Sequence, residues 1–576
     1  MHPSDYFVGT HLKYTTMNTD NMISVNCRNC NVTKSYPAGT TLMDIYNDLK
    51  PQMKYGPLAA RANNKTKNLA FRIYKPKVVD FIGLECESGR RVYARSLSFV
   101  LYKAIREVMT GVRLRVELTV ANGFYCRLLN SDRKPVLIDQ KVIDQLKQNM
   151  RKTVESNLPF VMETLPTSEA IKIFTADGAA DEVNLLSSLG QLYCQVYRLG
   201  DLYDYYAGAL VPSTGYVDKF DLIKYKDGLL LFMPEVDDAT KVSKYEPQEK
   251  LFDAYNEHVK WNELIGLSNI GDLNRIVKSS KDPSMLIAVS EALQDKKIAN
   301  IADTICSDPR RRVVLIAGPS SSGKTTFSKK LSIHLTINGK KPIPFSLDDY
   351  FVDRDKTPKD ENGEYDFESL YALDLDLFNR HLNQILNGEE VELPYYNFET
   401  GKREYRGNKI KLGDGGILVI EGIHGLNPEL TAQVPAESKF KIYASALTTI
   451  SLDDHNWIPT TDNRLLRRIV RDYNYRSYSA EDTINRWASV HKGEEKWIYP
   501  FRSQADMMFN SALIFELAVL KRYAEPILNM VPQQSMAYSE AHRLLKFLQF
   551  IIPIPDANIP KTSLLREFFG GSSFKY

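Results

Sequence analysis

Residues 318–325, Gly-Pro-Ser-Ser-Ser-Gly-Lys-Thr, have the spacing of a phosphate-binding loop. Gly318 permits a tight turn, and Gly323 lets backbone amides approach phosphate oxygens closely. Lys324 supplies a positive charge for β- and γ-phosphates, and the Thr325 hydroxyl is a suitable magnesium ligand. The predicted nucleotide-phosphate contacts therefore include Gly318, Pro319, Ser320, Ser321, Ser322, Gly323, Lys324, Thr325 and Thr326.

Two carboxylates downstream have the chemistry that a phosphoryl-transfer site needs. Asp348 lies in Ser-Leu-Asp-Asp-Tyr, directly after one apolar run, and Glu421 ends another, Leu-Val-Ile-Glu. A carboxylate at a strand's C-terminal end faces the ligand crevice of an open parallel sheet, where Asp348 could accept a hydroxyl proton or hold magnesium. Glu421 is predicted as a further magnesium ligand. The alternatives are a capping or loop aspartate, for Asp348 and its neighbour Asp349, and a purely structural glutamate.

Four arginines, Arg464, Arg467, Arg468 and Arg471, recur at i, i+3, i+4 and i+7 and share one helix face. Like charges on one face repel each other unless an anion lies opposite. Phosphoryl transfer depends on charge neutralisation, so this face predicts a phosphate-clamping lid. A solvated basic face is the alternative.

The elements around the loop fit this chemistry. Residues 313–317 form a continuous apolar run that predicts a strand buried on both faces, and the helix predicted from Lys324 to about Asn338 places its positive N-terminus under the phosphates. Gly339 is the expected helix stop. Residues 340–347 and 416–420 predict two more strands. Alternation of strands and helices predicts an α/β domain with a mainly parallel sheet.

The rest of the chain predicts further domains. With 576 residues it exceeds one core. We predict a loose arm at 1–21, a small α+β module at 22–84 with a helix at 41–50, and a second α+β domain at 85–243. That domain has helical periodicity at 97–109 and a strand-like run at 229–233. Residues 244–305 predict a helical connector broken at Asp282-Pro283. A nucleotide-binding domain at 306–535 and a C-terminal extension at 536–576 complete the chain.

Bulk composition excludes several classes of protein. Hydrophobic residues make up 43% and charged residues 25%, and the formal net charge is +3, so no global basic field predicts nucleic-acid or membrane binding. No signal peptide and no run of about 18 apolar residues is evident. Cys27 and Cys30 alone have metal-like spacing, without a second ligand pair. Reduced thiols and a cytoplasmic location are the expectation.

The region from about Val313 to Leu528 resembles the uridine–cytidine kinases of the phosphoribulokinase/uridine kinase group. The matching segments are the loop, 346–351, 365–367 (Tyr-Asp-Phe), 394–398 (Pro-Tyr-Tyr-Asn-Phe), 421–423, 467–472 and Ala505-Asp506. The resemblance implies ATP as phosphate donor and Asp348 as general base on a ribose 5′-hydroxyl. It further implies Mg²⁺ held by Thr325, Asp348 and Glu421, Asp366 on the ribose and Tyr396 beside the nucleoside. Arg468 would contact substrate, and Arg471 and Arg476 would clamp phosphates.

Three positions depart from the uridine–cytidine kinase pattern. The base-reading histidine of that family falls on Gly401, and its further arginine and glutamine contacts fall on Tyr478 and Arg486. The preferred base, and the use of ATP rather than GTP, therefore stay open.

The front of the chain resembles threonyl-tRNA synthetase. Residues 22–84 look like its TGS module, a β-grasp fold, and residues 85–243 look like its editing domain, through Asn122-Gly-Phe-Tyr and Val211-Pro-Ser-Thr-Gly. The four metal-type editing positions fall on Arg95, Phe99, Tyr206 and Leu210, so that chemistry is predicted to be absent. Contact with RNA or another partner, a scaffold and a dimerisation role remain alternatives.

Together these parts resemble bacterial nucleoside kinases with a synthetase-like N-terminus, and they predict a multi-domain α+β and α/β protein. The leading hypothesis is ATP- and Mg²⁺-dependent phosphorylation of a uridine- or cytidine-like nucleoside. The alternatives are a kinase for another small hydroxyl metabolite and a nucleotide-gated RNA- or ribosome-binding regulator. The sequence leaves the oligomeric state, including a homo-oligomer, open.

Overall fold

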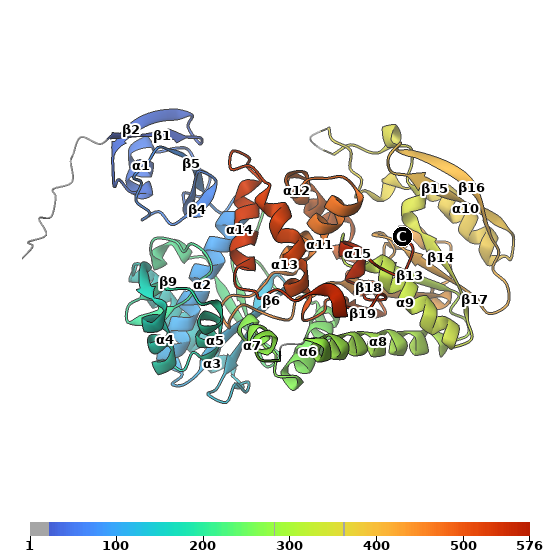
Figure 1. Cartoon of the computed structure of the whole chain (residues 1–576), viewed down its shortest axis with the longest axis horizontal. Helices are drawn as coiled ribbons and strands as arrows, with labels where there is room; N and C mark the ends of the chain where they lie inside the picture. Colours follow the sequence, from blue (N-terminus) through green and yellow to red (C-terminus); the bar gives the residue numbers. More distant parts are fainter. Residues whose placement is uncertain (1–21, 281–282, 361–362) are drawn as a thin grey trace, which may run out of the picture.

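The chain arranges its domains in order from the small N-terminal sheet to the nucleotide-loop sheet at the opposite end (Figure 1). This computed structural model describes residues 22–280, 283–360 and 363–576, so the predicted arm at 1–21 lies outside the described residues. No helix in the described ranges is both long and apolar enough to span a bilayer.

The first module is a mixed five-stranded sheet with one helix packed on it. Its strand order is β2-β1-β5-β3-β4, with β1 parallel to β5. The helix lies where it was predicted, because Thr41 and Asp44 form a reciprocal capping box at its start. Cys27 and Cys30 are free thiols. The elements are β1 (Met22–Cys27), β2 (Val32–Pro37), α1 (Leu42–Leu49), β3 (Ala59–Ala62), β4 (Lys65–Lys67) and β5 (Lys77–Ile82).

The second region is α+β, as predicted, and contains two antiparallel sheets, β11-β12-β7-β6 and β10-β9-β8. Its long helix α2 begins at Glu87, ten residues before the predicted start at Leu97. The first turns of α2 contain polar side chains that interrupt the helical spacing of apolar residues. Arg90, for example, donates hydrogen bonds to the carbonyls of Pro234 and Glu235. The elements are α2 (Glu87–Val108), β6 (Arg113–Val120), β7 (Gly123–Leu129), α3 (Gln140–Glu155), β8 (Val161–Pro166), α4 (Thr167–Ala176), α5 (Ala180–Leu189), β9 (Tyr193–Leu199), β10 (Leu202–Asp204), β11 (Asp221–Tyr225) and β12 (Gly228–Phe232).

Three helices follow and lead to the last sheet. They are α6 (Glu249–Leu264), α7 (Ile270–Ser280) and α8 (Ser284–Cys306), and Pro283 directly precedes α8. These helices lie in the range for which the sequence predicts a helical connector. Of the predicted break at Asp282-Pro283, Asp282 lies outside the described residues.

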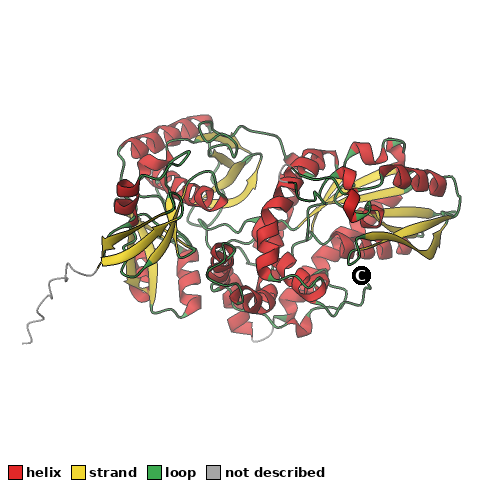
Figure 2. Cartoon of the chain, turned by 90° about the horizontal axis from the view of Figure 1, so that it is seen from above, coloured by secondary structure: helices red, strands yellow, loops and turns green. Residues whose placement is uncertain are grey.

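The last sheet is entirely parallel, with the strand order β14-β17-β13-β18-β19. Successive residues of β13 face opposite sides: Val314 and Ile316 pack with Phe327 of α9, whereas Val313 and Leu315 pack with Phe378 of α10. Helices therefore cover both faces, as Figure 2 shows, and the predicted strands are confirmed. The elements are β13 (Val313–Ala317), α9 (Lys324–Ile337), β14 (Lys341–Ser346), α10 (Leu375–Leu386), β17 (Gly416–Glu421), β18 (Lys439–Ser445) and β19 (Met507–Asn510).

A two-stranded hairpin and three helices surround the C-terminal edge of this sheet. The hairpin is β15 (Val391–Asn397) paired with β16 (Lys402–Ile410), and the helices are α11 (Thr460–Tyr475), α12 (Ala480–Trp497) and α13 (Glu516–Asn529). The arginine-rich segment lies in α11, as its spacing predicts.

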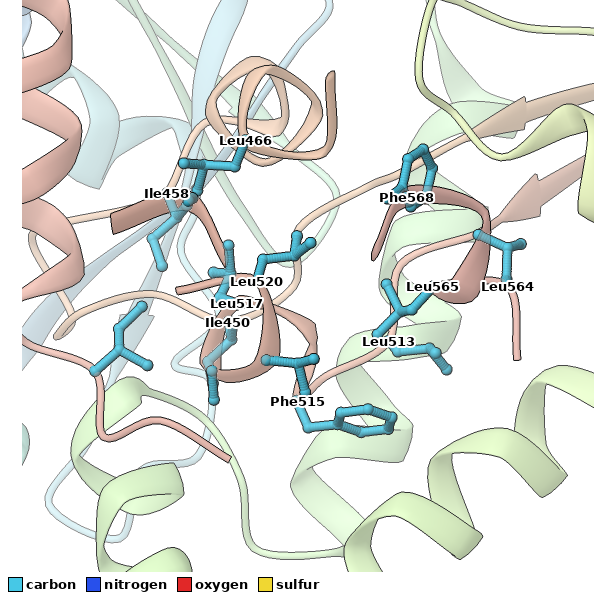
Figure 3. Packing of buried hydrophobic residues seen from close by; sticks show 14 of the residues in the cluster. Ile450, Ile458, Leu466, Leu513, Phe515, Leu517, Leu520, Leu564, Leu565 and Phe568 are labelled. Atoms are coloured by element: carbon cyan, nitrogen blue, oxygen red, sulfur yellow. The ribbon is translucent and has the colours of Figure 1, made fainter. Parts of the chain in front are cut away.

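The C-terminal segment contacts both the first module and the domain that carries the nucleotide loop. Helix α14 (Tyr538–Leu548) lies against β4 of the first module, whereas α15 (Arg566–Phe569) lies against α11. Figure 3 shows Leu564, Leu565 and Phe568 near Leu513, in one buried cluster with Phe515. The segment is therefore part of the core that surrounds the nucleotide loop.

Candidate active site

The loop at 318–325 connects β13 to α9 and requires glycine at two positions. A Cβ on Gly318 would lie 2.0 Å from the carbonyl oxygen of Ala444, so no larger residue fits there. Gly323 has a φ of +80°, and a Cβ on it would lie 2.5 Å from Leu564. These close contacts fix a strand–loop–helix turn whose amides point into the crevice at the carboxyl ends of the strands.

The side chains of Lys324 and Thr325 complete the loop and form hydrogen bonds beside it. The Lys324 Nζ donates hydrogen bonds to the carbonyls of Gly318 (2.9 Å) and Pro319 (3.3 Å). The Thr325 hydroxyl donates to a carboxylate oxygen of Glu421 at 3.1 Å. The structure thus brings together a lysine and a hydroxyl from the start of α9 and a carboxylate from the end of β17.

Asp348 lies in the turn that follows β14, and Glu421 ends the adjacent strand β17. The two strands pair in parallel with Ser346 opposite Glu421, so the two carboxylates lie near each other. Burial, and next the negative charge of Asp348, raise the pKa of Glu421 to about 7, whereas Lys324 opposes the shift. Two neighbouring carboxylates next to a threonine hydroxyl offer the oxygen donors that Mg²⁺ prefers. Thr325, Asp348 and Glu421 therefore fit a magnesium ion.

The four-arginine face is not a uniform phosphate clamp. Arg464 and Arg467 are at most 1% exposed, and each pairs with a buried carboxylate, Glu494 for Arg464 and Glu516 for Arg467. Both also donate to loop carbonyls, those of Ser320 and Ser321 respectively. Arg464 and Arg467 therefore support the loop through its backbone carbonyls. The prediction that these two residues belong to a phosphate clamp is wrong. The anions that their charges require come from the protein itself.

The remaining arginines retain excess positive charge. Arg468, Arg471 and Arg476 all contact the single buried carboxylate of Asp472, at 3.2, 3.0 and 3.7 Å. Arg471 and then burial lower the pKa of Arg476 to about 10, and burial followed by Arg471 lowers that of Arg468. Because Arg468 also donates to the Ser320 hydroxyl at 2.8 Å, this charge lies beside the loop, where a phosphate would relieve the repulsion.

The residues predicted to contact the sugar lie around the same crevice. The backbone amide of Tyr396, in β15, donates to Asp349 at 3.3 Å, which ties the hairpin to the segment that carries Asp348. Tyr396 is only 3% exposed and packs against Phe351, with 5.5 Å between ring centroids. Asp366 is half-buried and accepts a hydrogen bond from the Glu368 amide at 3.1 Å. No direct contact links Asp366 to Asp348 or Tyr396 among the described residues.

The three departing positions are occupied by other interactions. Gly401 has a φ of +68°, and a Cβ there would lie 2.8 Å from Arg354, whose amide bonds to the Gly401 carbonyl at 2.9 Å. The guanidinium of Arg486 lies 4.4 Å from the ring centre of Tyr478. These contacts involve all three positions at which the sequence departs from the uridine–cytidine kinase pattern.

Two acidic residues of the site, Glu494 and Glu368, were not predicted from the sequence. Glu494 accepts a hydrogen bond from the Ser320 amide at 3.0 Å. Burial raises the pKa of Glu368 to about 7; Arg468 opposes this shift, whereas Glu494 and Asp348 add to it. Glu368 lies only two residues after Asp366, but Glu494 lies in a helix with no motif of its own, so no local pattern could have identified it.

A third unpredicted residue, Glu567, comes from the C-terminal segment. Its carboxylate accepts hydrogen bonds from both the amide (3.0 Å) and the hydroxyl (2.7 Å) of Thr326. The Tyr576 hydroxyl lies 2.9 Å from the same Thr326 hydroxyl. An acidic side chain of the chain itself therefore occupies an anion-binding amide of the loop.

The four editing-type positions of the front region divide into two pairs. Phe99 and Leu210 are fully buried in its core, whereas Arg95 and Tyr206 line a cavity. Neither pair offers a thiolate or imidazole ligand, so these four positions form no zinc site.

Comparison with known proteins agrees with this geometry. Residues 313–515 match the Phosphoribulokinase / Uridine kinase family. The match supports a P-loop kinase acting on a small hydroxyl-bearing substrate.

Individual relatives of the phosphoribulokinase/uridine kinase region and of the front region match only parts of the chain. A uridine kinase of Halobacterium salinarum is 27% identical over 195 residues, which are 34% of this chain and 77% of that kinase. Threonine–tRNA ligase 1 of Bacillus subtilis is 28% identical over 191 residues, 33% of this chain. The chain spans only 29% of that ligase's length. The structure of a possible uridine kinase from Bacillus stearothermophilus is 24% identical, with a TM-score of 0.27, and covers 37% of this chain and 98% of its own.

Proposed function

We propose that this chain transfers the γ-phosphate of ATP to the ribose 5′-hydroxyl of a nucleoside. The observation that carries the proposal is the convergence of Lys324, Thr325 and Glu421 with the half-buried carboxylate of Asp348 at the ends of adjacent parallel strands. Asp348 would accept the proton of the attacking hydroxyl, while Lys324 neutralises charge on the transferred phosphoryl group.

The other side chains would bind and orient the two substrates. Thr325, Asp348 and Glu421 would hold Mg²⁺, which when bound supplies charge neutralisation at the donor phosphates. Arg468, Arg471 and Arg476 would contact phosphate oxygens, because one carboxylate, Asp472, balances only part of their charge. Tyr396 and Asp366 would position the sugar.

A kinase for another small hydroxyl compound remains a second candidate. The specific observation in its favour is the region of Gly401, where Arg354 fills the place of a base-reading side chain and Arg486 stacks on Tyr478. Such a site provides a cation for an acceptor that carries its own negative charge.

The test is to incubate the full chain with Mg²⁺-ATP and two panels, nucleosides and phosphorylated or free sugars, and to identify products by mass spectrometry. We expect nucleoside 5′-monophosphates. Products only from the sugar panel would favour the second candidate, and turnover on neither panel would refute both.

Asp348→Asn is the decisive variant. We expect kcat to fall by about 10² to 10⁴, the range for loss of a general base, with ATP affinity within about threefold of the parent. Asp349→Asn is the matched control, since its carboxylate accepts from the Tyr396 amide and should affect mainly KM for the acceptor. Full turnover in Asp348→Asn would rule out its role as the base.

A further inference from the structure

A cavity lies where three parts of the chain meet. No residue of the nucleotide loop lines it. It has a volume of about 330 Å³ and is lined by β4 and its following loop, by α2, by β9 and the 205–209 loop, and by α14. Figure 1 shows α14 beside α2 and β4, in the middle of the molecule. This size is within the range of small-ligand sites, roughly 300 to 1,000 Å³.

The cavity wall carries positive charge that the protein does not neutralise. Arg95, Lys67 and Lys546 all line it, and none of them forms an ion pair with a carboxylate in the ranges that the structure describes. Arg95 donates only to a neutral carbonyl, that of Ala209, at 3.1 and 3.2 Å. By contrast, the two other arginines of the wall are paired, Arg91 with Glu540 (3.0 Å) and Arg543 with Asp462 (2.6 Å).

The unpaired cations repel each other across the cavity. Burial and the charges of Lys546 and Lys65 lower the pKa of Lys67, and burial with Lys65 and Arg95 lowers that of Lys546. Burial and the neighbouring lysines likewise lower the pKa of His542 to about 4. Gathering these charges without an anion costs free energy, and an anionic ligand between them would recover it.

The backbone is shaped to admit the Arg95 guanidinium. A Cβ on Gly208 would lie 2.7 Å from the Arg95 Cζ, so glycine at this position lets the guanidinium lie flat on the 205–209 loop. Several aromatic side chains also line the cavity: Phe71, Tyr193, Tyr197, Tyr205, Tyr206 and Phe550. A planar guanidinium next to tyrosine rings suits a ligand that has both a phosphate and a ring.

We propose that this cavity binds a small phosphate ester with an aromatic or heterocyclic ring, such as a mononucleotide. Its phosphate lies between Arg95, Lys67 and Lys546, and its ring lies on the tyrosine wall. The site takes a ligand by charge and stacking and uses none of the groups at the nucleotide loop.

The test is calorimetric titration of the full chain with a nucleoside 5′-monophosphate, with the same nucleoside lacking phosphate, and with inorganic pyrophosphate. A Lys324→Ala background weakens binding at the loop, so that the second site is measured by itself. We expect monophosphate binding to exceed nucleoside binding at least tenfold, with pyrophosphate intermediate.

Substitutions in the cavity wall test whether the monophosphate binds in this cavity. Arg95→Gln, which can still donate to the Ala209 carbonyl, and Lys546→Gln, at the exposed rim, should each weaken monophosphate binding roughly tenfold. Lys141→Gln, an exposed lysine of α3, is the control and should change nothing. Unchanged affinity in Arg95→Gln, or equal affinity for the unphosphorylated nucleoside, would overturn the proposal.

An RNA partner would give a different result. A short RNA hairpin that displaces the monophosphate at equal phosphate concentration, through the same three side chains, would assign the cavity to a macromolecule and overturn the small-ligand proposal. All these readouts are of binding, so they are independent of whether the kinase reaction occurs.

Discussion

At the nucleotide loop, the single side chain of Glu368 has a free-energy cost of ionisation that burial and neighbouring charges set. Glu368 lies near the carboxylates of Glu494 and Asp348, opposed by Arg468. In a protein without a bound phosphate or metal, such a group lowers stability when it ionises. The ionised Glu368 carboxylate beside the nucleotide loop therefore lowers the free energy of unfolding of the chain.

Glu368→Gln should show this cost as a pH dependence. The folded pKa of about 7 lies above the ordinary value of 4.5, so the folded state binds the extra proton and stability falls as the pH rises from about 4.5 through 7. The variant lacks this loss, and we expect its Tm advantage over the parent to widen by roughly 1 to 3 °C between pH 5.5 and 8. Thermal unfolding in chelator measures it.

Glu392→Gln, on the exposed hairpin, is the matched control and should show no such widening. A Tm difference for Glu368→Gln that is constant with pH would contradict the raised pKa.

At the same residue scale, prediction from the sequence succeeded where residues are adjacent and failed where they are not. The loop, Asp348 and Glu421 lie at strand ends, and hydrophobic periodicity fixes strand ends. Glu494 and Glu567 reach the loop from a helix and a tail more than 170 residues away, the Ser320–Glu494 pair being separated by 174 positions. Local patterns carry no information on such contacts, and they also hid the partners that neutralise Arg464 and Arg467.

Among the elements, the C-terminal segment with α15 contacts the start of α9 directly beside the loop. Glu567 accepts from the amide and hydroxyl of Thr326, positions that a nucleotide phosphate would otherwise use. ATP and Glu567 would then compete for the same donors.

Glu567→Gln should therefore tighten ATP binding by about 3- to 10-fold, because an amide oxygen is a weaker competitor than a carboxylate. Equilibrium titration with a fluorescent ATP analogue measures this, and Glu525→Gln, on the exposed side of α13, is the control. Weaker binding in Glu567→Gln would mean that the segment supports the loop instead of competing for it.

Element types followed from the sequence better than element extents. Three of the five parallel strands, β13, β14 and β17, and the helix α9 were predicted within one or two residues, because each is bounded by charge or glycine. The start of α2 was missed by ten residues, since its polar side chains bond to a distant loop. Tertiary contacts there replace the amphipathic pattern on which prediction depends.

At the scale of the whole molecule, one buried loop joins the front region to the region that carries the nucleotide loop. Residues 453–456, Asp-Asp-His-Asn, extend from the kinase region into the front region and are 0 to 5% exposed. Asn456 accepts from the Ala207 amide at 2.9 Å and donates to the Tyr205 carbonyl at 2.9 Å. His455 bonds to Asp204 at 2.9 Å. The two halves thus satisfy each other's polar groups.

Asn456→Ala should destabilise both halves together. It leaves a buried amide and a buried carbonyl without partners, which costs about 2 to 4 kcal/mol. Urea denaturation followed by fluorescence should show a lower midpoint, and Asn383→Ala, whose side chain bonds only to exposed Gln433, should leave the midpoint unchanged. A normal midpoint for Asn456→Ala would show that the halves are stable independently.

The same loop constrains how this combination of domains can diverge. Asp204 and His455 lie on different halves but share one buried hydrogen bond, so neither can change by itself without leaving a polar group unpaired. Inheritance of the two halves is then linked. Among proteins that combine these two halves, substitutions at 204 and 455 should occur in pairs, and exchange of one half for a homologous domain should fail unless the loop at 453–456 is exchanged with it.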